Sequence, residues 1–387
     1  MTAAPSQRRP RILCVSFSPI FEDARVLRQI AVLREHGDVV TVGYGPKPSG
    51  AAAHIEVPSD AVSLPRTPLG VAKLALRAHR SVELTAPGEV AVKRFVKDRG
   101  PYDLVVANDA RALPLAFHAA GGAPVWADMH EWAPHETASL LSWRILVAPY
   151  MEYLCRTYLP STSAVTTVSA GLAELYHQHF GVETGVVRSA PPFHDLAPKP
   201  VQGGVIRLVH SGIADTRRNL PTLIEAIDKL GEGFTLDLFL VEVPGGHLDA
   251  LKGMAATRPG VTVHDPVPPA TLPNVLNDFD LGVFLFPIKT LSQRHHLPNK
   301  FFDFVQARLG LVFSSAPEIE AHIGKYGLGV ITADTSADAL VDSLQRLTPD
   351  DVMRFKNAAH EAAHALSNES DSAFQHALIE RLLVDRK

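Results

Sequence analysis

The sequence contains little cysteine and no long apolar run. Only two cysteines, Cys14 and Cys155, occur in 387 residues, so a disulfide framework is excluded, and we interpret both as core residues in a reducing compartment. No apolar stretch approaches the roughly 20 residues that cross a bilayer, and the apolar segment Arg11–Ser18 lacks a small-residue cleavage site. We therefore expect a cytoplasmic protein with at most peripheral contact at the inner face of a membrane.

The sequence also lacks a strong excess of either charge. Its 37 Lys and Arg residues are balanced by 41 Asp and Glu residues, and 46% of all residues are apolar. A dedicated nucleic-acid binder needs a basic surface and a disordered chain has few apolar residues, so neither class fits. The length is sufficient for two domains of about 190 residues, each with its own core.

Apolar segments of strand length alternate with segments of helical periodicity in both halves of the sequence. In the first half we expect strands at Arg11–Phe17, Val39–Gly43, Asp103–Ala107, Ala123–Ala127 and Ala164–Val168, and helices at Ala24–Glu35 and Leu140–Leu159. In the second half we expect strands at Ile206–His210, Leu236–Val241, Val261–His264, Leu281–Phe286 and Leu311–Ser314, and helices at Pro221–Leu230 and Asn299–Ala307. This alternation predicts α/β domains with parallel sheets that are buried on both faces.

The proline- and glycine-rich stretch Ala190–Gly204 breaks both periodicities and predicts an interdomain linker. We expect a Rossmann-like N-terminal domain over 1–193, a linker over 194–204 and a Rossmann-like C-terminal domain over 205–365. A helix over 366–387 would pack back across the junction. Doubly wound sheets bind ligands at the carboxyl ends of their strands, so the cleft between the domains is the expected ligand site.

The segment Leu297–Phe304 combines a predicted helix start with charged side chains. Pro298 and Asn299 mark the start, where free N–H groups and the helix dipole favour an anion, and Lys300 adds a full positive charge. Asp303 follows one turn later, where it can accept hydrogen bonds from vicinal hydroxyls such as those of a ribose. A phosphate site and a capped helix with solvated charges explain this pattern about equally well.

A second anion site is indicated by the strand end His210–Ile213 and the Arg217-Arg218 pair that follows it. Gly212 lets a ligand approach the backbone closely, and an arginine fork binds phosphate oxygens in pairs. An arginine pair on a solvated loop is the alternative. The phosphate interpretation gains weight because this loop falls at the same end of its strand as the loop before Asn299.

Ionisable side chains follow two neighbouring apolar strands of the first half. Asp128, His130 and Glu131 come directly after one strand, and Asp109 follows the other. Burying several ionisable groups at a strand end is costly, so we favour a functional role over a structural one.

The first strand-to-helix loop carries Asp23 and Arg25 but no glycine-rich dinucleotide fingerprint. A Rossmann dehydrogenase is therefore disfavoured. The pattern His360-Glu361-Ala362-Ala363-His364 matches that of zinc proteases, but chance gives such a match in roughly one chain of this composition in twenty-five. We interpret it as part of a solvated amphipathic helix and expect no metal site.

Together these motifs resemble the retaining glycosyltransferases of family 4, which have the GT-B fold of two Rossmann-like domains. The resemblance covers essentially the whole chain. The matching elements are Asp23 with Arg25, Asp128–Glu131, Thr167–Ser169, His210–Asn219, Leu297–Lys300 with Asp303, Leu311–Ser315, and Pro317 with Glu318. The sequence LPNK followed by an acidic residue three places on is the most specific of these elements.

The resemblance implies a hexosyltransferase-like enzyme that moves a sugar from a nucleoside-diphosphate sugar to an acceptor hydroxyl with retention of configuration. No metal or other cofactor is implied, and the acceptor would be a glycan, a lipid-linked sugar or a small molecule. Arg218 and Lys300 would neutralise the diphosphate, and His130 would lie beside the donor sugar. The remaining donor-side residues would be Gly212, Asn299, Asp303 and Glu318. The acceptor-side residues would be Asp23, Arg25, Asp109, Asp128 and Glu131.

Three alternatives stay open at this point. A nucleotide-sugar 2-epimerase of the same fold would use the same donor without an acceptor. A non-catalytic nucleotide-sugar-binding protein is the second alternative, because His295 and Asp303 stand where family members often carry two glutamates. A zinc peptidase is a distant third.

Overall fold

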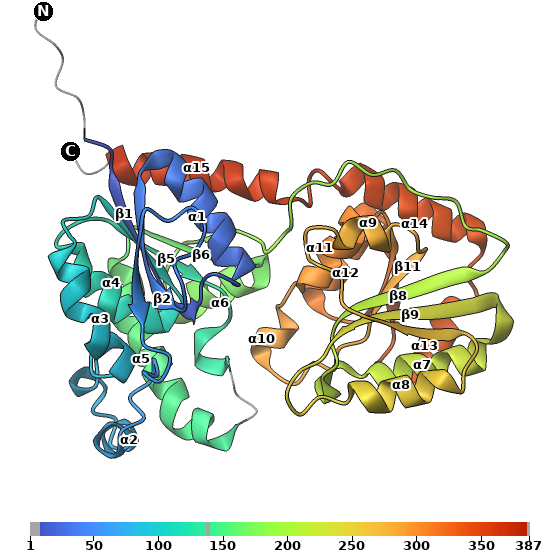
Figure 1. Cartoon of the computed structure of the whole chain (residues 1–387), viewed down its shortest axis with the longest axis horizontal. Coiled ribbons are helices and arrows are strands. Elements are labelled where there is room, and N and C mark those ends of the chain that lie inside the picture. The colour runs from blue at the N-terminus through green and yellow to red at the C-terminus, as the bar shows by residue number, and fades with distance from the viewer. Residues whose placement is uncertain (1–7, 137–139, 385–387) are drawn as a thin grey trace, which may run out of the picture. The chain divides into compact units, whose positions relative to one another are not determined.

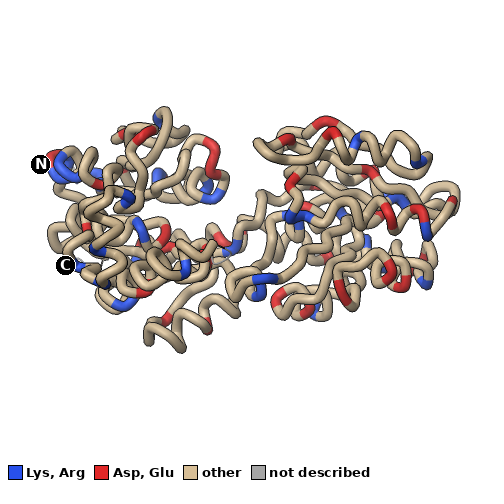
Figure 2. The backbone as a smooth tube through the Cα atoms, turned by 90° about the horizontal axis from the view of Figure 1, so that it is seen from below, with Lys and Arg blue, Asp and Glu red and all other residues tan. Residues whose placement is uncertain are grey.

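The computed structural model describes residues 8–136 and 140–384. Contacts divide the chain into two compact units, which we call unit 1 and unit 2 (Figure 1). Unit 1 is formed by the described residues of Met1–Arg188, Thr290–Ser292 and Asp371–Lys387, and unit 2 by Ser189–Lys289 and Gln293–Ser370. Charges of both signs are spread over both units (Figure 2), as the balanced composition implies.

Unit 1 contains a seven-stranded parallel sheet with the strand order β3-β2-β1-β4-β5-β6-β7. Its strands are β1 (Arg11–Pro19), β2 (Asp38–Tyr44), β3 (Ala53–Val57), β4 (Leu104–Asn108), β5 (Val125–Met129), β6 (Ala164–Thr167) and β7 (Thr184–Val186). Every residue of β4 and β5 is buried, because helices cover both faces of the sheet. Cys14 and Cys155 are free and buried, as expected.

The helices of unit 1 are α1 (Ala24–His36), α2 (Pro68–Ala75), α3 (Pro87–Asp98), α4 (Leu113–Ala120), α5 (Ala148–Tyr158), α6 (Ala170–Phe180) and α15 (Asn368–Val384), whose first three residues belong to unit 2. The helix expected over Leu140–Leu159 is two elements. A π-helical segment spans Trp143–Val147, and α5 follows it. Pro149 lies in the first turn of α5. Backbone N–H groups in a first turn have no helical hydrogen-bond partner, so the missing N–H of proline costs nothing there and the proline favours a helix start.

Helix α15 completes the core of unit 1 from the far end of the sequence. Its Leu378, Ile379 and Leu382 pack in one buried cluster with Ile12 and Trp126 of the sheet. Figure 1 shows α15 beside α1, where the His36 and His376 rings approach with Nε2 and Nδ1 2.7 Å apart.

Unit 2 contains a six-stranded parallel sheet with the order β10-β9-β8-β11-β12-β13. Its strands are β8 (Ile206–Ile213), β9 (Phe234–Val241), β10 (Val261–His264), β11 (Leu281–Phe284), β12 (Gly310–Ser314) and β13 (Gly329–Thr332). Its helices are α7 (Leu220–Leu230), α8 (Leu248–Ala256), α9 (Leu272–Leu276), α11 (Asn299–Gln306), α12 (Pro317–Tyr326), α13 (Ala337–Leu344) and α14 (Pro349–Ala362), and α10 (Leu291–Arg294) spans the division between the units. The expected class of two Rossmann-like parallel-sheet domains is confirmed.

Residues 187–205 form neither helix nor strand, and buried Arg308 holds part of this segment against unit 2. Its guanidinium donates hydrogen bonds to the carbonyl oxygens of His194 at 2.6 Å and Leu196 at 3.1 Å. The same side chain donates to Nδ1 of His360 at 3.1 Å. The first histidine of the zinc-protease pattern is thus engaged in fixing the chain. Across the described ranges 8–136 and 140–384, no helix is long and apolar enough to span a membrane.

Candidate active site

In unit 2 the candidate site lies where the strand order reverses. The chain leaves β8 for β9 on one side, whereas β11 pairs with β8 on the other side. Such a reversal leaves a crevice at the carboxyl ends of the two central strands, which is where open parallel sheets bind ligands. Gly212 lies near the end of β8, and Phe284 ends β11.

Lys300 lies directly against the backbone of Gly212. A Cβ atom at position 212 would be only 2.5 Å from Lys300 Nζ and 2.8 Å from Lys300 Cε, and the Gly212 φ of +148° is one that other residues rarely adopt. Helix α11 begins at Asn299, so Lys300 belongs to its first turn, whose backbone N–H groups are free of helical hydrogen bonds. The structure thus brings together two residues that the sequence had placed in separate anion sites.

Arg218 and Lys300 also converge. Lys300 Nζ lies 5.3 Å from the centroid of the Phe284 ring, and Arg218 Cζ lies 6.0 Å from the same centroid and 5.1 Å from that of Phe286. Burial and the nearby Arg218 guanidinium lower the pKa of Lys300 to about 8. Two cations held together at a sheet edge repel each other, and a bound anion would relieve that repulsion.

His210 is a member of this site to which the sequence analysis assigned no role of its own. The side chain is buried, and its Nδ1 lies 2.9 Å from the carbonyl oxygen of Val283, so we assign the proton to Nδ1. Its Nε2 is buried and has no hydrogen-bond partner. Burial, with Lys300 and Arg218 nearby, lowers the pKa of His210 to about 3. The ring is therefore neutral and offers an unsatisfied acceptor beside the two cations.

The other sequence-predicted donor residues lie on two helices. Asn299 is exposed at the start of α11, and Asp303 is close enough to Lys300 to oppose the lowering of its pKa. Glu318 is buried in the first turn of α12. Burial lowers the pKa of His295 although Glu318 acts in the opposite direction, which places these two side chains near each other.

In unit 1 the carboxyl end of β5 carries a buried carboxylate, Asp128. Its Oδ1 accepts hydrogen bonds from Arg25 Nη2 and Thr166 Oγ1, both at 2.7 Å, and its Oδ2 accepts one from Arg25 Nε at 3.1 Å. Burial alone would raise the pKa of Asp128, but Arg25 and His130 outweigh it and hold that pKa well below its usual range. This buried pair fixes Arg25 beside the end of β5.

Asp23 caps helix α1. Its carboxylate accepts a hydrogen bond from Val26 N at 3.2 Å and another from Ser18 Oγ at 2.8 Å. The cap fixes the turn that presents Arg25 to Asp128. Asp23 and Arg25 therefore have structural partners within unit 1, and their expected acceptor-side role remains a prediction.

His130 is held by the ends of two strands. Its Nε2 lies 3.0 Å from Asn108 Oδ1, and its backbone N–H donates to Asp109 Oδ1 at 2.9 Å. Burial lowers the pKa of His130, but Asp109 and Asp128 outweigh this effect and leave it above 6.5. Asp109 has φ +67° and ψ 164°, a conformation that costs a non-glycine residue about 1–3 kcal/mol. Such strain is typical of residues held in place at a functional site.

A pocket of about 150 Å³ opens beside His130, and acidic side chains line most of its polar wall. These are Asp109, Glu131 and Glu136, with Arg111 paired to Glu136 at 2.9 Å. Glu131 is exposed at this pocket, where the surrounding atoms together with Glu136 and Asp109 raise its pKa to about 7. A carboxyl group whose pKa lies near 7 can accept hydrogen bonds from hydroxyl groups and exchange protons with them.

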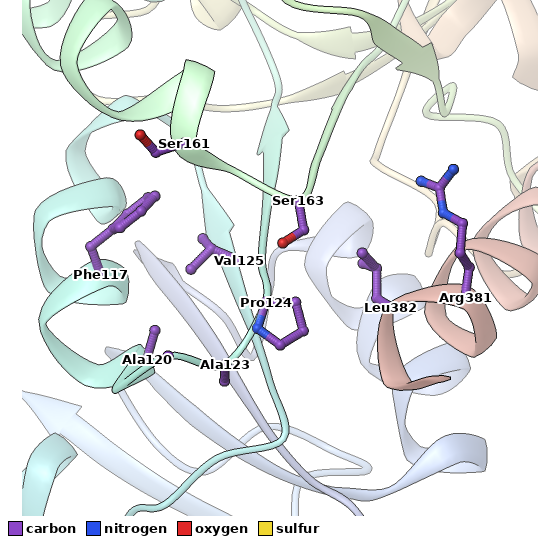
Figure 3. Close-up of a pocket in the computed structure, with 10 residues that line it drawn as sticks. Phe117, Ala120, Ala123, Pro124, Val125, Ser161, Ser163, Arg381 and Leu382 are labelled. Atoms are coloured by element: carbon purple, nitrogen blue, oxygen red, sulfur yellow. The ribbon is translucent and has the colours of Figure 1, made fainter. Parts of the chain in front are cut away.

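Two other features are not part of this site. A cavity of about 770 Å³ lies at the amino-terminal edge of the unit 1 sheet, lined by residues such as Val125, Ser163 and Leu382 (Figure 3). That edge is opposite to the one where parallel sheets bind ligands.

Within the residues that the structure describes, no group of three or more His, Cys, Asp or Glu side chains could hold a metal ion.

Residues 23–192 match the family model of the Glycosyl transferase 4-like domain. This segment belongs to the glycosyl transferase 4-like family. The resemblance to family 4 that the motifs indicated is thereby confirmed, and the segment contains the whole His130 site. A search of curated protein sequences found no match.

Solved structures similar to this chain cover both units. HepE from Anabaena, determined in complex with UDP and glucose, is 15% identical with a TM-score of 0.65, and the match covers 97% of this chain and 100% of HepE. Sucrose-phosphate synthase from Thermosynechococcus elongatus is 14% identical with a TM-score of 0.66, covering 98% and 100%. A glycosyltransferase from Rickettsia africae is 12% identical with a TM-score of 0.66, covering 97% and 99%. The chain therefore has the GT-B fold.

Proposed function

We propose that this protein transfers a sugar from a nucleoside-diphosphate sugar to an acceptor hydroxyl with retention of configuration. The observation that carries the proposal is the convergence of Arg218 and Lys300 at Gly212, at the strand-order reversal of unit 2. A diphosphate matches two fixed cations and the free N–H groups at the start of α11. The match of residues 23–192 to glycosyl transferase 4-like domains supports the same reaction class.

On the donor side, Lys300 and Arg218 neutralise the diphosphate, and Gly212 lets its oxygens approach the backbone. Asn299 lies at the start of α11, Asp303 accepts hydrogen bonds from the ribose hydroxyls, and Glu318 lies on the next helix. His210 Nε2 accepts a hydrogen bond from a hydroxyl of the bound donor, because its lone pair has no partner in the protein.

On the acceptor side, the pocket of Asp109, His130 and Glu131 holds hydroxyl groups. In the transfer step the bond between the anomeric carbon and the diphosphate oxygen breaks. The acceptor oxygen bonds to that carbon on the same face, and the acceptor proton passes to the departing diphosphate. Negative charge accumulates on the diphosphate in the transition state, so Arg218 and Lys300 supply the main electrostatic stabilisation.

UDP-glucose is the first donor to test. HepE was determined with UDP and glucose, and the structurally similar trehalose-6-phosphate protein from E. coli was determined with UDP-2-fluoro glucose, at 11% identity and a TM-score of 0.63. A nucleotide screen identifies the base, and product analysis identifies the sugar and the acceptor.

The decisive experiment is a thermal-shift screen with UDP, GDP, ADP, CDP and TDP. One nucleoside diphosphate should raise the melting temperature, because a ligand that binds only the folded state stabilises it by mass action. Lys300→Ala should abolish the shift, and Arg217→Ala should keep it, since Arg217 is exposed and paired with Asp215 at 2.8 Å. If none of the five diphosphates stabilises the wild type, the proposal fails.

Product analysis separates transfer from epimerisation. With the donor that the screen identifies, a transferase forms a new glycoside only when an acceptor is present, and NMR of that glycoside should show the anomeric configuration of the donor. An epimerised sugar nucleotide in the absence of acceptor would identify an epimerase. Tight donor binding without turnover on any acceptor pool would identify a binding protein.

A further inference from the structure

The pocket beside His130 is too small to enclose a whole acceptor. It measures about 150 Å³, whereas sites that enclose a small-molecule ligand typically measure roughly 300–1,000 Å³. Asp109, Glu131 and Glu136 line it, and the Arg111 side chain in its wall is paired with Glu136 at 2.9 Å. An acceptor that brings its reacting hydroxyl to this acidic pocket therefore extends beyond it.

Arg111 also lines a second, larger pocket of unit 1, which we call the Tyr44 pocket. It measures about 380 Å³, and its lining residues include Pro19, Tyr44, Val62, Leu64, Arg66 and Arg111. Among the residues that the structure describes, no aspartate or glutamate lines it. The two pockets thus share one residue of their walls and differ in the sign of their charge.

The Tyr44 pocket lies where the strand order of the unit 1 sheet reverses. The chain leaves β1 for β2 on one side, whereas β4 pairs with β1 on the other side. Pro19 ends β1, Tyr44 ends β2, and Arg111 belongs to the short helical turn that follows β4. Open parallel sheets bind ligands at the carboxyl ends of their strands at such a reversal. The pocket therefore has the position in unit 1 that the Gly212 site has in unit 2.

Hydrogen bonds and burial fix the walls of the Tyr44 pocket. The Tyr44 hydroxyl donates to the carbonyl oxygen of Ala61 at 2.7 Å, and Arg111 Nη1 donates to Ser63 Oγ at 3.2 Å. Burial raises the pKa of Tyr44, although Ser63 and Arg111 act in the opposite direction, which places these three polar groups close together. Leu64 of the same loop is buried in the core of unit 1.

Arg66 adds a second positive charge to this pocket. The residue is exposed, and among the described residues no side-chain hydrogen bond or ion pair engages its guanidinium. Arg111 keeps N–H groups for a ligand, because its bonds to Glu136 and Ser63 use only two of its five donors. One solvated arginine is ordinary on a surface. Two arginines from separate segments that line one pocket without a carboxylate suit a phosphate or carboxylate ligand.

We propose that the acceptor is a monosaccharide that carries an anionic group, a phosphate or a carboxylate, and that the Tyr44 pocket binds this group. The inference rests on the proposed transfer reaction, whose acceptor pocket it extends. Arg66 and Arg111 bind the anion, and the sugar carbon atoms pack against Tyr44 and Val62. The acidic side chains beside His130 repel an anion, so the anionic end lies away from the reacting hydroxyl.

Acceptors that differ only in charge test this proposal. With the donor that the nucleotide screen identifies, we would compare glucose, glucose 6-phosphate and glucuronate, and the same three forms of galactose and mannose. At least one anionic sugar should have a kcat/KM about tenfold or more above that of its neutral parent, because a hydrogen bond to a charged group strengthens binding by that much. The preferred form identifies the anion as phosphate or carboxylate.

Arg66→Ala separates recognition of the anion from folding. It should raise the KM for the anionic acceptor about tenfold or more, while kcat and the KM for the neutral parent stay near wild type. Arg66→Lys should recover part of the loss. Arg94→Ala is the matched control, because Arg94 lies on α3 outside the pocket with an 87% exposed side chain and its removal changes the net charge equally. Raising the salt from 0.1 to 0.5 M should weaken use of the anionic acceptor only.

Calorimetry with the anionic sugars in the absence of donor gives a second readout. At least one of them should bind the wild type and bind Arg66→Ala about tenfold more weakly. Equal use of neutral and anionic sugars, use of neutral sugars alone, or equal losses from Arg66→Ala and Arg94→Ala would overturn the inference and leave the transfer reaction standing. Binding of an anionic sugar that depends on Arg66, without a glycoside from any acceptor, would instead keep the pocket and contradict the proposed transfer.

Discussion

Arg218 and Lys300, which come from different helical segments of unit 2, hold their charged groups over one ring, that of Phe284. The sequence analysis expected these two cations to neutralise one diphosphate, which requires their charged groups to lie close together. They do converge, and Gly212 lies against one of them. Among the described residues, no side-chain hydrogen bond or ion pair engages the Arg218 guanidinium, although Asp215 lies near enough to act on its pKa. The guanidinium can therefore bind an anion.

Removing either cation should slow transfer. We expect Arg218→Ala and Lys300→Ala each to lower kcat/KM by an amount equivalent to about 2–4 kcal/mol, because each removes a charge-assisted contact to the developing anion. Steady-state kinetics with the identified donor measures this loss. Arg217→Ala is the neighbouring control and should stay close to wild type. Equal losses in Arg217→Ala and Arg218→Ala would mean that only general positive charge matters.

Donor binding should weaken as the pH rises. The pKa of Lys300 is about 8 without ligand, and a bound diphosphate raises it by favouring the charged form. Affinity is therefore full below pH 8 and falls above it, as the free protein loses the proton that the complex keeps. Calorimetric Kd values between pH 7 and 9.5 should show this fall in the wild type. In Lys300→Arg the profile should be flat, because arginine stays charged; a flat wild-type profile would contradict the assignment.

Gly212→Ala should impair donor binding without unfolding unit 2. The new Cβ would lie only 2.5 Å from Lys300 Nζ and would clash with it, and the alanine would have to keep the glycine's φ of +148°. The ammonium can move, since it ends a flexible side chain, so we expect a loss of nucleotide affinity of about tenfold or more. Gly253→Ala is the control, because a Cβ there meets nothing within 4 Å. Unchanged affinity in Gly212→Ala would show that the ammonium position is not critical.

Asp128→Asn should destabilise unit 1. The substitution leaves the buried guanidinium of Arg25 without its counter-charge, which costs about 3–5 kcal/mol. All three tryptophans, Trp126, Trp132 and Trp143, lie in unit 1, so tryptophan fluorescence in a urea titration follows this unit. Glu152→Gln, which breaks the exposed pair with Arg156, should change stability by less than about 1 kcal/mol.

The same pair should show a defined pH dependence. The folded-state pKa of Asp128 lies below its unfolded value, so the ion pair contributes its full stabilisation above about pH 4 and loses it as the pH falls further. The difference in unfolding free energy between wild type and Asp128→Asn should therefore shrink between pH 5 and pH 3. A constant difference over that range would show that the carboxylate charge is not what stabilises the pair.

The central strands could be predicted from the sequence because parallel strands buried on both faces read as uninterrupted apolar runs. The edge strands β3 and β7 were not predicted, because their short sequences are not continuous apolar runs: half-buried His54 and exposed Glu56 interrupt β3, and β7 has only three residues. The start of α11 was predictable from Pro298 and Asn299. Helix propensity alone did not reveal the π-helical turn before α5.

The candidate site was predictable in its charges and not in its contacts. Lys300 and Arg218 stood out by motif, but their shared ring, Phe284, looks like any other residue of an apolar strand. The pairing of Arg25 with Asp128 joins residues far apart in the sequence, and no local pattern indicates it. Nothing in the sequence signals that Asp109 has a positive φ, because the surrounding fold imposes that conformation.

The position of α15 has a consequence for the order in which the protein matures. Every segment of unit 2 is synthesised before residues 371–384, whereas the groove that receives Leu378 and Ile379, beside Ile12 and Trp126, stays exposed to water until those residues are made. The half of the protein that is synthesised first is thus the half that closes last.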